Sequence, residues 1–308
     1  MKQASKAAGM IAMYEEHFET ILARWVTDAV NAAQTKIQDA LQAHDSDSAP
    51  FTVLDVGCGL GSMALEFAER FLPATDPSHV RMIASDNWQD MLTRVQERLE
   101  TPRYARFASQ IETKVMDGQT LEPLGDDSVN VVMSSFGISI FPDQDKGWGS
   151  AHRVLKPNGL LVATAWDPQS TTIKRNDALA IANHQASPVG GEDPSASPLV
   201  LPSTKTSTTP EQLIKRLEGF GFRDVLVFRT AHSAILPRAG ALADVMVQNM
   251  GSKVDILGEA HYREVLFKVV ESGFASIYTS QSSSLDTKRD LNTPGVEENI
   301  AYVVLATK

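Results

Sequence analysis

The sequence predicts an α/β protein built on a mostly parallel sheet with helices between its strands. Short apolar runs rich in β-branched residues alternate with segments whose apolar residues recur at helical spacing, which is typical of βαβ units. One such run, Val53–Val56, leads through glycines at alternate positions directly into a helical pattern. This combination predicts a strand, a tight turn and a helix.

The remaining elements follow in order. The first forty-odd residues have a helical pattern with an aromatic face, on which Tyr14 is a candidate to cover a ligand. After a polar break, strands are expected at 53–56, 80–85, 111–116, 129–133, 160–166, 222–229 and 300–306. A helix is expected from Pro210 to Gly219, with Thr209 as N-cap and Gln212 completing a capping box. We also expect a mobile loop over 186–210 and helices near 240–250 and 259–272.

These elements indicate three regions. We expect an N-terminal helical cap over 1–48, a ligand-binding core over 49–168, and the rest of the sheet over 169–308.

Composition limits the possible partners. The formal net charge of −10, without a long run of lysine or arginine, argues against a nucleic-acid partner. A single cysteine, Cys58, excludes an internal disulfide and a cysteine-based zinc cluster, and no metal site is expected. No apolar run suits a signal peptide or a membrane span, so we expect a soluble cytoplasmic protein. The oligomeric state cannot be read from these features.

Polar residues follow several of the predicted strands, at the edge where open parallel sheets bind ligands. They are the glycine turn, Asp86, Asp117-Gly118 and Ser134. A carboxylate after the second strand can accept hydrogen bonds from ribose hydroxyls, and one after the third can accept from the adenine amine. This set predicts a ligand that contains adenosine.

The glycine spacing discriminates between two such ligands. A nicotinamide dinucleotide needs G-x-G-x-x-G, but counting from Gly57 and Gly59 the third position is Ser62 and the glycine stands one place early, at Gly61. The region also lacks the lysine of a P-loop. The spacing therefore favours a ligand without a pyrophosphate.

The stretch from Val53 to Gly61 resembles the first motif of class I S-adenosylmethionine-dependent methyltransferases. Later stretches agree in order and spacing: Asp86, Met116-Asp117-Gly118, the strand 128–137, and the turn 153–160. The resemblance is strongest to the small-molecule branch that includes ubiquinone- and menaquinone-biosynthesis methyltransferases. Asn130 and Asn158 depart from the family's usual aspartate and glycine, and asparagine tolerates the left-handed turn that Asn158 has to form.

The resemblance implies a Rossmann-like, doubly wound sheet of seven mostly parallel strands with an antiparallel last strand, plus helical cap segments. In that picture the stretches 169–209 and 231–299 are insertions that join the cap. The resemblance also implies S-adenosylmethionine as cofactor and a role for each matching residue. Asp55 would orient the glycine loop, Asp86 would hold the ribose, and Asp117 would take the adenine amine. The remaining cofactor-binding candidates are Gly57, Cys58, Gly59 and Gly61 along the loop, Asn87 and Trp88 beside adenine, Gly118 and Gln119 through their backbone, the Ser134 backbone at the methionine amino group, and Tyr14.

We therefore expect a methyltransferase that moves a methyl group to an O, N, S or C nucleophile of a small molecule. No residue is assigned as a catalytic base, since positioning of the acceptor can supply much of the rate. Two alternatives stay open: an S-adenosylmethionine-binding protein without transferase activity, and an NAD(P)-binding oxidoreductase, which the glycine spacing disfavours.

Overall fold

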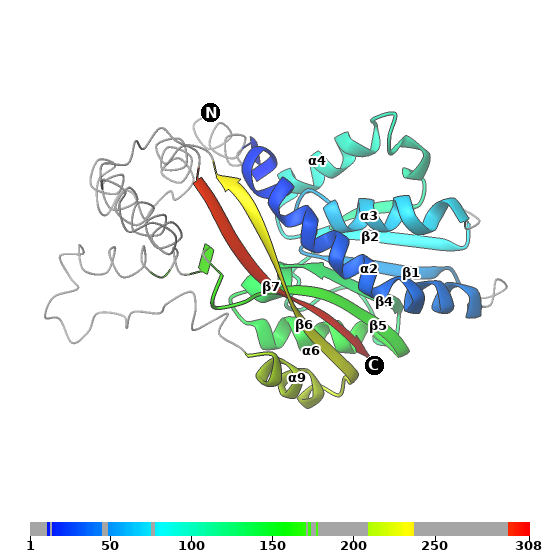
Figure 1. The fold of residues 1–308 in the computed structure, drawn as a ribbon. Helices are drawn as coiled ribbons and strands as arrows, with labels where there is room; N and C mark the ends of the chain where they lie inside the picture. The colour runs from blue at the N-terminus through cyan, green and yellow to red at the C-terminus, as the bar shows by residue number, and fades with distance from the viewer. Residues whose placement is uncertain are drawn as a thin grey trace, which may run out of the picture. The chain divides into compact units, whose positions relative to one another are not determined.

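The computed structural model describes residues 11–12, 14–44, 49–74, 78–170, 172–173, 177, 209–236 and 295–308. In this part of the chain seven strands form one sheet, in the order β3-β2-β1-β4-β5-β7-β6 (Figure 1). The strands are β1 Phe51–Val56, β2 Val80–Asp86, β3 Ile111–Val115, β4 Val129–Ser135, β5 Leu155–Trp166, β6 Arg223–Leu236 and β7 Gly295–Thr307. The pairs from β3 to β5 are parallel, and β7 runs antiparallel to β5, with Leu160 opposite Thr307. The predicted fold class is confirmed.

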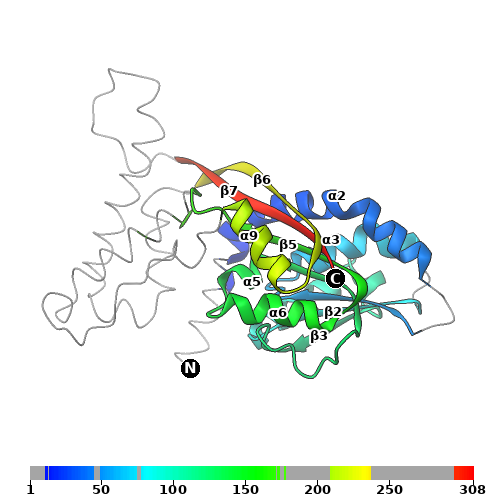
Figure 2. The ribbon, with the colours of Figure 1, turned by 90° about the horizontal axis from the view of Figure 1, so that it is seen from below.

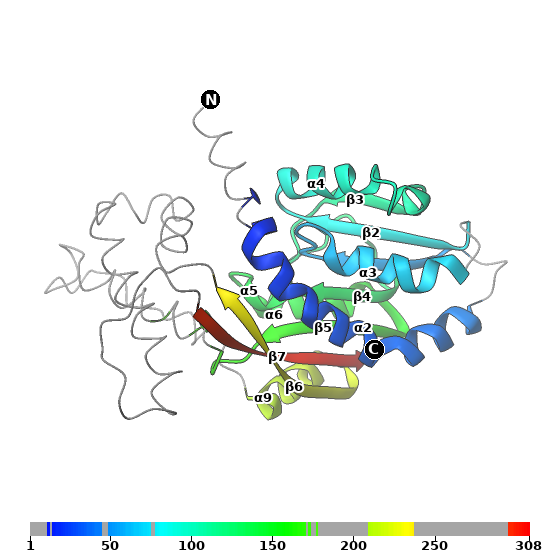
Figure 3. The same ribbon diagram turned by 45° about the horizontal axis from the view of Figure 1, so that its top comes forward.

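Helices cover both faces of this sheet because its strands are apolar on both faces. Val53 packs into one core, together with residues of α2 and α3, whereas Leu54 and Val56 pack into the other. The first face carries α2 Thr20–Ala43, α3 Ser62–Phe71 and α4 Gln89–Leu99 (Figure 3). The opposite face carries α5 Gly137–Ile140, α6 Gln144–Val154 and α9 Pro210–Gly219 (Figure 2). Short helical turns are η1 Tyr14–Glu19, η2 Leu72–Ala74 and η3 Ala105–Phe107.

The long helix α2 packs on the sheet through one apolar stripe. Its buried residues are Trp25, Val26, Ala29, Val30, Ala33 and Ile37. These residues recur at spacings of three and four, so they lie on one side of the helix. Within the described residues, no helix combines the length and apolarity needed to cross a bilayer.

The predicted capping box of α9 is present. Thr209 Oγ1 accepts from Gln212 N, and Gln212 Oε1 accepts from Thr209 N at 3.0 Å. Strand β5, by contrast, begins at Leu155, five residues before the predicted start at Leu160. The Pro-Asn-Gly turn is a bulge inside the strand, because Asn158 adopts φ 64° and its N–H donates to Lys308 O at 3.0 Å.

The other departure from the usual family sequence, Asn130, links two strand starts. Its Oδ1 accepts from Thr52 N of β1 at 2.9 Å and from Lys156 Nζ of β5 at 3.0 Å. One amide oxygen thus joins β1, β4 and β5 at the edge opposite the glycine loop.

The last two strands are longer than predicted. β6 continues past Arg229 to Leu236, and β7 begins at Gly295 rather than Ile300. The loop and helices predicted within 186–208, 240–250 and 259–272 lie outside the described residues.

The chain divides into two compact units. The sheet unit comprises Phe18–Trp166, Thr208–Thr230 and Ala301–Lys308, and the second comprises Met1–His17, Asp167–Ser207 and Ala231–Ile300. In the second unit, the buried Asn299 Oδ1 accepts from Ser170 Oγ at 3.0 Å and from Thr172 Oγ1 at 2.7 Å. The domain boundaries given by the sequence remain a prediction.

Candidate cofactor site

The glycine turn after β1 has the left-handed backbone that its sequence indicates. Gly57, Gly59 and Gly61 have φ values of 65°, 53° and 80°, and α3 begins directly after Gly61. At Gly61 an added Cβ would lie 3.0 Å from Val95 Cγ2, so neither the conformation nor the space suits a side chain. The turn brings the first peptide groups of α3 to the carboxyl end of β1.

Asp55 fixes the start of α3 from below the turn. Its side chain is fully buried, and Oδ2 accepts from Ala64 N at 3.0 Å. Within the described part of the chain, the other oxygen, Oδ1, has no hydrogen-bond partner. Burial raises the pKa of the Asp55 carboxyl from 3.8 to about 7, and the charge of Asp86 adds to this rise. These contacts match the loop-orienting role that the sequence resemblance implies.

Asp86, at the end of β2, lies against the glycine turn. Its Oδ2 accepts from Gly59 N at 3.0 Å, and its Oδ1 accepts from Trp88 N at 2.9 Å. Burial also raises the pKa of this carboxyl, against the lowering effect of those N–H groups. The Cys58 N–H donates to Ser85 O at 2.8 Å, which ties the turn to the end of β2. The structure therefore brings the glycine turn and the second-strand carboxylate together, as predicted.

The other candidates around Asp86 differ in exposure. Asn87 is exposed, and Trp88 is half-buried with its indole N–H directed to Asp90 Oδ2 at 3.3 Å. Cys58 is half-buried, and desolvation together with Asp55 and Asp86 raises the pKa of its thiol well above the usual range. The adenine contacts of Asn87 and Trp88 remain predictions.

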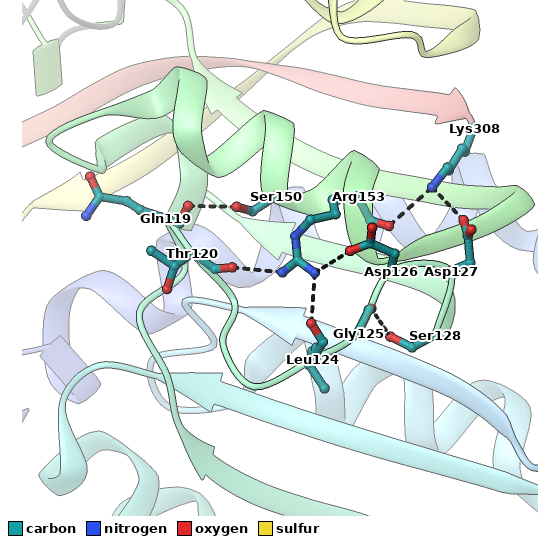
Figure 4. Close-up of polar contacts among 10 residues, drawn as sticks. All are labelled: Gln119, Thr120, Leu124, Gly125, Asp126, Asp127, Ser128, Ser150, Arg153 and Lys308. Carbon is teal, nitrogen blue, oxygen red and sulfur yellow. Dashed lines mark hydrogen bonds and ion pairs between the residues drawn. The ribbon is translucent and has the colours of Figure 1, made fainter.

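The segment after β3 carries Asp117, which is exposed at the same edge of the sheet. Gln119 N donates to Asp117 Oδ1 at 2.8 Å, and Gln119 Oε1 accepts from Asp143 N at 3.0 Å. Ser150 of α6 donates to Gln119 O at 2.7 Å (Figure 4). The backbone of this segment is thus fixed next to a carboxylate that keeps access to solvent.

Arg153 of α6 holds the rest of this loop (Figure 4). Its Nη2 donates to Thr120 O at 2.9 Å, and its Nη1 donates to Leu124 O at 2.8 Å and Asp126 Oδ1 at 2.9 Å. Close by, Lys308 Nζ bonds Asp127 Oδ1 at 2.7 Å and Arg153 O at 3.2 Å. The guanidinium fork spans both ends of the loop between Asp117 and β4, which keeps that loop in one conformation.

The Phe141 ring supports the glycine turn and the β3 segment from the α6 side. An added Cβ on Gly118 would lie 2.3 Å from Phe141 Cζ, and one on Gly57 would lie 3.6 Å from Cε1 of the same ring. Gly118 is therefore needed because the aromatic ring occupies the place of a side chain.

Ser134, at the end of β4, is buried and uses its hydroxyl internally. Its Oγ donates to Val56 O at 2.8 Å and accepts from Ile138 N at 3.1 Å. These bonds join the end of β4 to the end of β1, from which the glycine turn begins. The contact of the Ser134 backbone with a methionine amino group remains a prediction.

An aromatic cluster follows Ser134 at the ends of β4 and β5. Phe136 adopts φ 59° and stacks on Trp166 with ring centroids 4.2 Å apart, while Trp25 of α2 meets both rings edge-on at 5.8 and 5.7 Å. All three rings are buried, so the cluster forms a closely packed aromatic layer at this edge of the sheet.

Several contributing residues carry no recognisable sequence signal. Four of them lie outside the motifs or are ordinary within them, and they make contacts across long sequence separations: Glu19, Arg98, Phe141 and Arg153. Tyr14 lies in the second unit, and its role as a cofactor contact remains a prediction.

Comparison with known proteins agrees with this geometry. Residues 54–163 match the family model described as a methyltransferase domain. A demethylmenaquinone methyltransferase of Deinococcus radiodurans is 31% identical over 123 residues, covering 40% of this chain and 46% of that protein. The ubiquinone/menaquinone biosynthesis C-methyltransferase UbiE of Geotalea daltonii is 32% identical over 110 residues, covering 36% and 43%. The chain spans less than half the length of these curated relatives.

Solved structures agree at the level of the fold. The YcgJ protein of Bacillus subtilis superposes with a TM-score of 0.51 at 14% identity, covering 89% of this chain and 98% of that one. Residues 54–163 are therefore similar to a methyltransferase domain, and the sheet has a Rossmann-like fold. Over residues 54–163, the expected likeness to S-adenosylmethionine-dependent methyltransferases and the expected cofactor are confirmed.

Proposed function

We propose that the protein is an S-adenosylmethionine-dependent methyltransferase that transfers a methyl group to an O, N, S or C nucleophile of a small molecule. The observation that carries this proposal is the position of Asp86, whose Oδ2 lies 3.0 Å from Gly59 N of the left-handed glycine turn. A ribose and a methionine chain are adjacent parts of one cofactor molecule. A carboxylate in direct contact with a glycine turn suits both parts, since the carboxylate can bind the ribose while the turn lines the methionine chain.

The charges around the turn favour a cationic ligand over a dinucleotide. Asp55 and Asp86 lie beneath and beside the turn, and Ser62 donates to the carboxylate of Glu19 at 3.0 Å. Ser62 stands where a dinucleotide fold has its third glycine. Of these carboxyl groups, Asp55 has a pKa raised to about 7 and Glu19 is paired with Arg98, so the charge argument rests on Asp86. A pyrophosphate would bring two negative charges next to Asp86, whereas a sulfonium carries a positive charge. This arrangement supports S-adenosylmethionine and disfavours NAD(P).

The residues that would hold the cofactor are those the strand ends supply. Asp86 would hold the ribose hydroxyls with the lone pairs left free by its two backbone donors. The exposed Asp117 would accept from the adenine amine, and the glycine turn with the Ser134 backbone would line the methionine part. When bound, the cofactor supplies a methyl group on an electrophilic sulfonium. The chain's own task is to fix that methyl group in line with the acceptor and to exclude water.

The substrate is proposed to be a small molecule. Relatives named for menaquinone and ubiquinone biosynthesis act on small molecules by their names, and the net charge of −10 disfavours nucleic acid. The shared region, 54–163, is the part proposed to bind the cofactor, so it leaves the acceptor atom open. A cytoplasmic location remains a prediction from the sequence.

Methyl transfer can be tested with S-adenosylmethionine carrying an isotopically labelled methyl group. The full chain is incubated with a panel of phenols, reduced quinones, amines and thiols, and products are read by mass spectrometry. The proposal expects labelled methyl on at least one acceptor together with S-adenosylhomocysteine. Tight S-adenosylhomocysteine binding without methyl gain on any acceptor would favour the alternative, a cofactor-binding protein without transferase activity.

A further inference from the structure

A polar relay surrounds Gly61, the last glycine of the turn. Arg98 Nη1 donates to Leu60 O at 2.9 Å and also bonds Glu19 Oε1. The same Glu19 oxygen accepts from Ser62 Oγ at 3.0 Å. The relay thus runs from the residue before Gly61, through two side chains, to the residue after it.

This relay joins three helices that are distant in sequence. Glu19 ends η1 and precedes α2, Ser62 begins α3, and Arg98 lies in the last turn of α4. The two charged side chains are 20% and 27% exposed, so water screens their attraction less than at an open surface. Val95, one turn earlier on α4, packs against Gly61 on the side that a Cβ would occupy.

The relay acts on the part of the turn that lies between the residues bonded by Asp86 and by Asp55. Asp86 fixes Gly59 N, and Asp55 fixes Ala64 N. Between these two anchors, Arg98 holds the Leu60 carbonyl before Gly61, and Glu19 holds the Ser62 hydroxyl after it. In addition, η1 is a π-helical turn, a rare conformation that is concentrated at functional sites.

We propose that Glu19 and Arg98 are positioning residues of the cofactor turn. Cofactor affinity then depends on the position of Glu19, which lies between η1 and α2. Arg98 and Ser62 transmit the position of Glu19 to the backbone around Gly61. This inference rests on the proposed function, because it assigns a role in holding the same cofactor.

The chain provides a matched control. Glu66 and Arg70 of α3 form an ion pair with 25% and 27% exposed side chains, and Arg70 also bonds Asn31 of α2. This pair has the burial of the Glu19–Arg98 pair and also joins α3 to α2. Among the residues the structure describes, it forms no hydrogen bond or ion pair with the turn around Gly61, so it isolates the effect of position.

The test compares Glu19→Gln, Ser62→Ala and Glu66→Gln in the full chain, by calorimetric titration with S-adenosylhomocysteine and by thermal unfolding. We expect Glu19→Gln to weaken binding about fivefold or more, with a smaller effect for Ser62→Ala. We expect Glu66→Gln to lower Tm comparably while its Kd stays within about twofold of wild type.

Combining Glu19→Gln with Ser62→Ala should weaken binding by less than the product of the two single effects. Both changes act on the same contact, since Glu19→Gln removes the charge of its acceptor and Ser62→Ala removes its donor. The inference is overturned if Glu19→Gln keeps wild-type affinity, or if Glu66→Gln weakens binding equally. Ser62→Ala provides the same comparison if Glu19→Gln folds poorly. Wild-type protein that binds no S-adenosylhomocysteine would instead contradict the proposed function, and this inference with it.

Discussion

Asp55 makes the stability of the protein depend on pH in an unusual direction. Its pKa rises from 3.8 to about 7 in the folded state, mainly because the carboxyl is fully buried. Between these values the unfolded chain has lost the proton and the folded protein keeps it. The folded state then binds more protons, so the unfolding free energy falls as pH rises through this window.

The size of the effect follows from the same values. A rise from 3.8 to about 7 corresponds to about 4 kcal/mol in full, of which about 3 kcal/mol falls between pH 5 and pH 8. Asp55→Asn removes the titration and keeps an oxygen that can accept from Ala64 N. The unfolding free energy of wild type relative to Asp55→Asn should therefore decrease by about 3 kcal/mol from pH 5 to pH 8.

Urea denaturation of both proteins at unit intervals of pH measures this difference. Titrations that do not interact with Asp55 are common to both proteins and cancel. They include His152, whose pKa is lowered mainly by burial and which acts with the opposite sign. The constant cost of placing an amide in the site cancels as well. A difference that stays flat from pH 5 to pH 8 would refute the assignment of Asp55 as a buried, protonated carboxyl.

Three further outcomes are expected. Asp86→Ala should weaken S-adenosylhomocysteine binding about tenfold or more, measured by calorimetry. It should also lower the unfolding free energy by about 1–3 kcal/mol, since Gly59 N and Trp88 N lose their acceptor. Unchanged affinity would show that Asp86 is not part of the site. Cys58, whose thiol pKa is raised, should react with a disulfide reagent at pH 8 at least about tenfold more slowly in the folded than in the urea-unfolded protein, and equal rates would contradict this. Gly118→Ala should lower the unfolding free energy measured in urea by about 1–3 kcal/mol, because its Cβ would lie 2.3 Å from a carbon of the Phe141 ring. Gly125→Ala should lower it far less, because an added Cβ there has nothing within 4 Å. Equal losses for the two variants would contradict the packing argument.

The fold was predictable because its signals are local. The capping box at Thr209, the glycine turn after β1 and the β-branched runs each determine the conformation of their own few residues. The prediction was wrong where local signals conflict with pairing: Asn158 forms a bulge inside β5 rather than a turn before it. Strand pairing with Lys308, 150 positions later, decides that outcome.

The site was predictable only where it consists of strand ends. Asp55 and Asp86 follow directly from the order of the strands, since parallel strands bring their carboxyl ends to one edge. Glu19 and Arg98 meet across 79 positions, and nothing in their neighbours distinguishes them from surface charges. The Phe141 ring fills the space left by Gly118, a relation that appears only when two distant segments are packed together.

The central claim is that the glycine turn and Asp86 form an S-adenosylmethionine site. Calorimetric titration of the wild-type chain with S-adenosylhomocysteine and, separately, with NAD tests it most directly. The account predicts stoichiometric binding of S-adenosylhomocysteine and no heat of binding for NAD. Tight binding of NAD without binding of S-adenosylhomocysteine would contradict it.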